Sequence, residues 1–73
     1  MRYLSSALRQ ARETAGLSRE QVAVAVRKSV RTIQEWERGA TEPDASDLGI
    51  IAGLTGRQLD YFFNPAESSE TSA

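Results

Sequence analysis

Apolar side chains return every three or four positions along much of this chain, and this is the spacing of a buried helical face. The first such repeat lies in residues 4–15 and is followed by Gly16, a residue type that commonly stands just past a helix C-terminus. We therefore predict a first helix over residues 4–15. Its apolar face consists of Leu4, Leu8, Ala11 and Ala15.

A second helix is predicted to begin after Ser18. Ser18 and Gln21 have the spacing of a capping box, in which the serine hydroxyl accepts the Gln21 amide and the Gln21 side chain reaches back. The stretch from Val22 to Val26 alternates weakly and is rich in β-branched residues, a composition that also suits a strand. The capping box and the helical neighbours favour the helix.

A third helix is predicted between Ser29, as its cap, and Gly39, where it ends. Ile33 and Trp36 lie one turn apart on its buried face. Trp36 is expected in the core rather than in contact with a base.

The remaining pattern predicts two more helices and a tail. Asp44 is a suitable N-cap for a fourth helix that Gly56 closes, and residues 58–63 predict a short fifth helix. Five short helices with short loops indicate an all-α fold, a compact helical bundle within a domain of residues 1–63. We expect residues 64–73, which are small and polar, to be a disordered tail or the start of a linker.

Composition narrows the possible chemistry. The 73 residues include no cysteine and no histidine, so disulfides, thiolate metal sites and the usual zinc ligand and general base are excluded. No carboxylate stands in a motif with catalytic spacing, and we expect no enzyme activity, metal or cofactor. No apolar run approaches the roughly 20 residues that span a bilayer, so we expect a soluble cytoplasmic protein.

The charge is distributed unevenly. Residues 1–39 hold eight basic and four acidic residues, whereas residues 40–73 hold Arg57 against six acids. These halves carry +4 and −5 and account for the net charge of −1. The asymmetry suggests a basic face for a polyanion, although chance clustering on a solvated surface gives the same distribution of charge along the chain.

The second and third helices together have the properties of a helix-turn-helix. Ala23 is small where the two helices must approach closely, and the first exposed turn of the third helix presents Val30, Arg31 and Gln34. A helix with a buried back and a polar front can enter a DNA major groove, which is about 12 Å wide. Four apolar side chains can share the core behind that front: Val22, Val26, Ile33 and Trp36.

The same stretch resembles the Cro and lambda-repressor-like helix-turn-helix family of prokaryotic and phage regulators. The resemblance covers roughly residues 4–63 and continues in Pro43 and the ending IAGLTGRQLDYFF. Its matching features are Leu17-Ser18, Glu20, Ala23, Ser29, Thr32-Ile33, Trp36-Glu37 and Gly39.

The resemblance implies a set of DNA-reading positions at the start of the third helix: Val30, Arg31, Gln34 and Glu35. Arginine can bridge guanine O6 and N7, and glutamine can bridge adenine N6 and N7. Val30 would touch a thymine methyl group. Glu35 would either accept a hydrogen bond from cytosine or pair with a neighbouring arginine, and Arg31 could instead contact a phosphate.

The resemblance also implies contacts to the DNA backbone and a structural ion pair. Helix N-termini favour phosphate, and basic side chains near them add charge. The expected phosphate contacts are Arg19, Gln21, Arg27, Lys28, Thr32 and Arg38. Arg12 and Glu37 match an ion pair that related repressors bury between the first and third helices.

Two residues depart from the family pattern. The tight turn usually has glycine where this chain has Arg27, and an apolar residue where it has Lys28. If Arg27 is left-handed, its side chain costs roughly 1 kcal/mol. The Lys28 stem can cover the edge of the core while its ammonium stays in water.

These features predict a sequence-specific transcriptional regulator, acting most simply as a repressor on double-stranded DNA. A homodimer would place two reading helices about 34–36 Å apart on an inverted repeat. The fifth helix is the candidate dimer contact, with core packing as the alternative role for its side chains Leu59, Tyr61, Phe62 and Phe63. The alternative function is an antitoxin or another protein-interaction module that reuses the fold.

Overall fold

Four α-helices and one short 3₁₀-helix make up the computed structural model, which describes residues 2–63. The all-α prediction is confirmed for these residues, and the expected tail at 64–73 lies outside them. The elements are α1 (Ser5–Thr14), α2 (Arg19–Val26), α3 (Val30–Arg38), α4 (Ala45–Thr55) and η1 (Leu59–Phe62).

The prediction of a fifth α-helix is wrong, because η1 is a single 3₁₀ turn of four residues. Its hydrogen bonds run over three residues, from the Tyr61 amide to the Gln58 carbonyl at 3.0 Å and from the Phe63 amide to the Asp60 carbonyl at 3.1 Å. Phe63 then adopts an extended conformation and forms an antiparallel bridge with Tyr3. The extended conformation of Phe63 in this bridge is incompatible with an α-helix through residue 63.

The helix starts form as the sequence indicates. The Gln21 amide donates to the Ser18 hydroxyl at 3.1 Å, and the Ser18 amide donates to Gln21 Oε1 at 2.7 Å, which completes the capping box. Ser29 caps α3 through the Thr32 amide, and Asp44 caps α4 through the Asp47 amide. That amide hydrogen bond lowers the pKa of the Asp44 carboxyl, with a smaller contribution from the nearby charge of Lys28.

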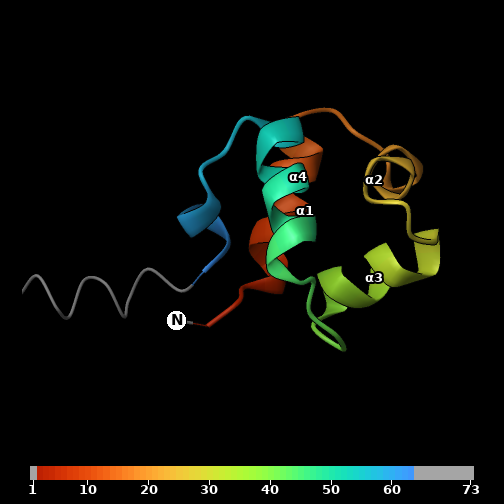
Figure 1. The fold of residues 1–73 in the computed structure, drawn as a ribbon, viewed down its shortest axis with the longest axis horizontal. Helices are drawn as coiled ribbons and strands as arrows, with labels where there is room; N and C mark the ends of the chain where they lie inside the picture. The colour runs from red at the N-terminus through yellow and green to blue at the C-terminus, as the bar shows by residue number, and fades with distance from the viewer. Residues whose placement is uncertain (1, 64–73) are drawn as a thin grey trace, which may run out of the picture.

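The helices enclose one apolar core (Figure 1). α1 and α4 lie in the middle of the view, with α2 and α3 on one side and η1 on the other. α3 packs against both α1 and α2, while α4 packs against α2 and η1. The four side chains predicted for the shared core of α2 and α3 are all buried: Val22, Val26, Ile33 and Trp36. Ala23, the small residue expected where the two helices approach, is buried as well.

Phe62 belongs to this core and is fully buried. It is therefore unavailable for the dimer contact that the sequence suggested for the fifth helix. Leu59 remains exposed, whereas Tyr61 and Phe63 are half-buried against the core.

The two ends of the described chain are held together. The Leu4 amide donates to the Phe62 carbonyl at 2.8 Å, next to the bridge between Tyr3 and Phe63. The buried Tyr3 hydroxyl donates to the Trp36 carbonyl at 2.9 Å, and burial raises the pKa of this phenol above its ordinary value. The N-terminal segment thus fixes the end of α3 as well as η1.

None of the helices within residues 2–63 combines the length and hydrophobicity needed to cross a membrane.

Candidate nucleic-acid interface

The turn between α2 and α3 determines how α3 is presented. Arg27 is left-handed, with φ 60° and ψ 43°, and is the one non-glycine residue with positive φ in the described part of the chain. The Lys28 amide donates to the Ala23 carbonyl at 3.0 Å and the Arg27 amide to the Val24 carbonyl at 3.2 Å. These two bonds form a Schellman motif, which closes α2 in the way that glycine usually does.

α3 shows a buried back and a polar front. Ile33 and Trp36 are buried, whereas Arg31 and Gln34 are exposed on the other side. The Arg31 side chain is 85% exposed, and Val30 is half-buried at the edge of the core. This amphipathic arrangement leaves the polar front of α3 open to a large partner such as a DNA groove.

Glu35 faces Arg31 on α3. The Arg31 Nε and Glu35 Oε2 atoms are 3.4 Å apart in an i,i+4 ion pair. Of the two roles open for Glu35, the structure therefore contains the pairing with arginine. An exposed pair of this kind is weak, so it constrains the Arg31 guanidinium little.

A buried ion cluster joins the first three helices. Arg12 Nε lies 2.6 Å from Glu37 Oε2, and both side chains are less than one-tenth exposed. Arg12 Nη1 also donates to the Leu17 carbonyl at 2.9 Å. The pair between Arg12 and Glu37 therefore links α1 to the last turn of α3.

Arg19 also binds Glu37, a contact that the sequence reading did not include. Its Nε lies 3.1 Å from Glu37 Oε1, the oxygen opposite the one that Arg12 Nε contacts. The arginine is held by its Nε, while 39% of the side chain stays exposed. The available signal was Glu37 itself, because its carboxylate was expected to be buried between the first and third helices and has a second oxygen that a further cation can bind.

Two of the expected phosphate contacts are partly used by helix capping. The Gln21 amide and Oε1 both bind Ser18, which leaves the side-chain NH₂ group as its donor toward an anion. Thr32 donates its amide to Ser29 Oγ, and the two hydroxyl groups lie 3.0 Å apart. Arg27, Lys28 and Arg38 are exposed.

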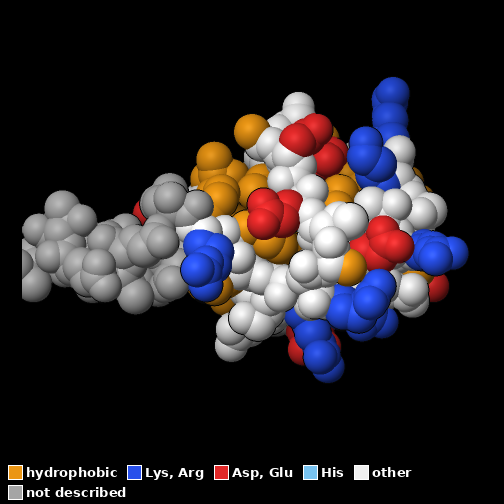
Figure 2. Space-filling model, turned by 90° about the horizontal axis from the view of Figure 1, so that it is seen from below, with side chains coloured by type: hydrophobic (Ala, Val, Ile, Leu, Met, Phe, Trp, Pro, Cys, Tyr) orange, Lys and Arg blue, Asp and Glu red, His pale blue; other side chains and the backbone are white. Residues whose placement is uncertain are grey.

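A cleft of about 450 Å³ opens between α1, α2 and α3. It is lined by Arg9, Arg19, Gln34, Glu37 and Arg38. Figure 2 shows most of the basic side chains of this view at the end of the molecule that α2 and α3 form. Within residues 2–63, no three His, Cys, Asp or Glu side chains come together as a metal site.

The geometry agrees with the comparisons to known proteins. A profile described as Helix-turn-helix matches residues 8–62, which is most of the chain. The chain belongs to this helix-turn-helix family. Its resemblance to Cro and lambda-repressor-like proteins is therefore confirmed at the level of the family.

Two solved structures are similar to this helix-turn-helix protein. One is the P22 c2 repressor bound to a synthetic operator, with 22% identity, a TM-score of 0.76, and coverage of 88% of this chain and 97% of that one. The other is the clp gene regulator ClgR from C. glutamicum, with 27% identity, a TM-score of 0.70, and coverage of 94% and 87%. No curated protein sequence matches the chain.

Proposed function

We propose that this chain is a transcriptional regulator that binds double-stranded DNA in a sequence-specific manner. The observation that carries the proposal is the exposed polar front of α3, backed by Ile33 and Trp36 and flanked by the arginine-lined cleft. The family match supports it, and so do two similar structures whose names describe a repressor with its operator and a gene regulator.

In this function, α3 enters the major groove. Arg31 and Gln34 read base edges through their paired hydrogen-bonding groups, and Val30 packs against a thymine methyl group. Glu35 holds Arg31 in place until a guanine replaces it. Backbone contacts then come from residues around this helix, which fix its register without reading sequence: Arg19, Gln21, Arg27, Lys28, Thr32 and Arg38.

We further propose that the regulator is a cytoplasmic repressor that binds the nucleoid as a homodimer on an inverted repeat. Leu59 and the exposed edges of Tyr61 and Phe63 supply the dimer contact. Tyr61 and Phe63 line a mainly apolar pocket of about 250 Å³ between the start of α1 and η1, together with Leu4 and Ala7. Binding to a full palindrome but not to its half-site at the same concentration supports this arrangement. Equal affinity for the two duplexes contradicts it.

Selection of bound duplexes from a random pool tests the function directly. We expect an enriched palindrome whose affinity falls steeply with salt, because bound phosphates displace counterions. The Arg31→Ala variant should lose about 1–3 kcal/mol of discrimination at one base pair while keeping its binding to random DNA. Arg57→Ala is the matched control, since Arg57 lies over the Tyr61 ring at the η1 end.

Two results would refute the proposal. One is binding that is absent, or insensitive to salt, for every duplex in the pool. The other is a set of chemical-shift changes on DNA titration that omits residues 30–38, which would favour the protein-interaction module instead.

A further inference from the structure

We propose that Arg9, on α1, is a further ligand of the DNA backbone and completes a phosphate pocket with Arg19 and Arg38. This inference rests on the proposed function and extends it to a helix outside the helix-turn-helix. The pocket is the cleft of about 450 Å³ between α1, α2 and α3.

The lining of the cleft is suited to a phosphate group. Its three arginines come from three different helices, so an anion at its mouth meets guanidinium groups from separate directions. Gln34, from the reading face of α3, lines the same cleft. A phosphate held there would therefore lie directly beside the side chains that read the bases.

The acid in the cleft does not repel such an anion strongly. Glu37 is 4% exposed, and its two oxygens are already bound to Arg12 and Arg19. Arg19 is attached through Nε, so its terminal nitrogens remain available for an oxyanion. Arg38 forms no salt bridge within residues 2–63, and its positive charge is not neutralised by a direct partner there.

Arg9 forms only a weak ion pair with Glu13. Its Nε lies 3.1 Å from Glu13 Oε2, and the two side chains are 60% and 54% exposed. Exposed i,i+4 pairs contribute little, whereas an arginine can bind a phosphate through two charge-assisted hydrogen bonds. DNA binding should thus transfer Arg9 from Glu13 to a phosphate.

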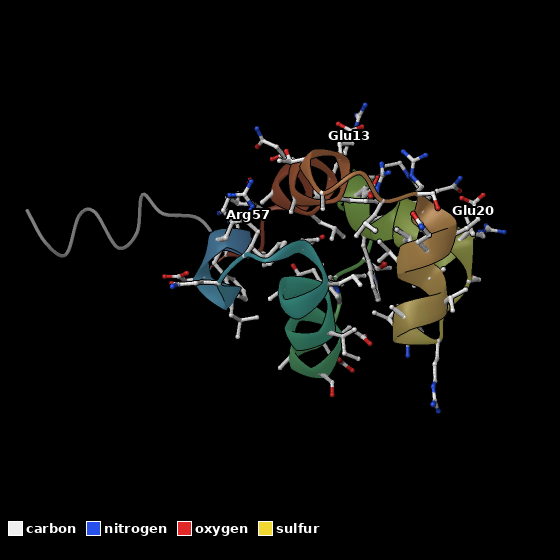
Figure 3. All side chains as sticks on the ribbon, turned by 90° about the horizontal axis from the view of Figure 1, so that it is seen from above. Glu13, Glu20 and Arg57 are labelled. Carbon is white, nitrogen blue, oxygen red and sulfur yellow. The ribbon has the colours of Figure 1, made fainter. Side chains whose placement is uncertain are left out.

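The Arg9→Gln variant tests this contact. It should weaken binding to the selected operator and to a random-sequence duplex by the same factor. That factor should be about tenfold at 0.1 M salt, because one lost phosphate contact changes the salt slope by about 0.9. Arg57→Gln removes the same charge beside η1, on the other side of the view from Glu20 (Figure 3), and should change affinity far less.

A second pair of variants separates the contact from general charge repulsion. Glu13→Gln releases Arg9 and should raise DNA affinity. In the Arg9→Gln background the same change should have a smaller effect, because the arginine that it releases is missing. Thermal unfolding of each variant checks that the fold is intact, and both side chains are exposed enough for this to be expected.

Arginine Nε–Hε spectra provide an independent readout. Titration with a random-sequence duplex should shift the signals of Arg9, Arg19 and Arg38 together, while that of Arg57 stays in place. Inorganic phosphate alone should produce much smaller shifts if the pocket requires the DNA backbone. Equal shifts with inorganic phosphate would overturn the assignment to DNA.

The inference also fails if Arg9→Gln matches Arg57→Gln in affinity and salt slope, or if the gain from Glu13→Gln is the same in both backgrounds. Those outcomes leave the proposed function standing, provided that the parent protein binds DNA and Arg31→Ala changes its base preference. A parent protein that binds no duplex removes the function and this inference together.

Discussion

Glu37 should contribute more to folding than any other charged residue of the described chain. Its carboxylate joins Arg12 at 2.6 Å and Arg19 at 3.1 Å, and its side chain is 4% exposed. Substitution of Glu37 by Leu leaves the buried Arg12 guanidinium without a close counter-charge, since Glu13 lies 3.8 Å from it and is itself half exposed.

The expected cost of Glu37→Leu is about 3–5 kcal/mol, the usual penalty for removing one member of a buried ion pair. The core of so small a domain rarely supplies more than about 3–5 kcal/mol of net stability. We therefore expect Glu37→Leu to be largely unfolded at room temperature. The Arg12→Met variant should be less affected, because Glu37 then keeps Arg19, which reaches water.

Urea denaturation followed by circular dichroism measures these differences, with a stabilising osmolyte added where a variant is marginal. The double variant Arg12→Met/Glu37→Leu should recover much of the loss, because it leaves neither buried charge unpaired. A Glu13→Leu variant is the surface control. The reasoning is refuted if Glu37→Leu costs no more than this control, or if the double variant is less stable than the sum of the two single changes predicts.

Two further changes test the turn and the N-terminal segment. Arg27→Gly should stabilise the protein by about 0.5–1 kcal/mol, because it relieves roughly 1–2 kcal/mol of left-handed strain at φ 60°. The larger backbone entropy of glycine in the unfolded chain offsets the rest of this gain. An unchanged or lower melting temperature in calorimetry would speak against strain. Because burial raises the pKa of Tyr3, the folded state keeps a proton that the unfolded chain releases, so stability should be complete below about pH 10 and decline above it. Tyr3→Phe should cost about 0.5–1.5 kcal/mol at neutral pH and flatten that decline in urea titrations, and a decline as steep as in the parent would contradict this cause.

The helix boundaries could be predicted because their causes are local. Ser18, Ser29 and Asp44 each cap a helix through the backbone amide three residues further on, so the sequence alone contains both partners. The left-handed conformation of Arg27 could be predicted only in part. Only the family's usual glycine drew attention to that position, and the φ angle itself depends on how α2 and α3 pack.

The features that sequence analysis missed depend on contacts between distant segments. η1 is cut short because Phe63 must meet Tyr3, and no local pattern encodes that pairing. Arg19 binds Glu37 across 18 positions because α2 packs against α3. Such a contact follows from the assembled helices rather than from the spacing within any one of them.

The hydrogen bond between Leu4 and Phe62 and the bridge between Tyr3 and Phe63 bring the two ends of the domain to one place on its surface. A short Gly/Ser linker could join these two positions, and new ends could then be opened in the exposed loop at Ala40–Glu42 between α3 and α4. Such a circular permutant would keep α2, its turn and α3 in their original order. The fold therefore allows the order of the other elements along the chain to be changed while α2, the turn and α3 stay intact.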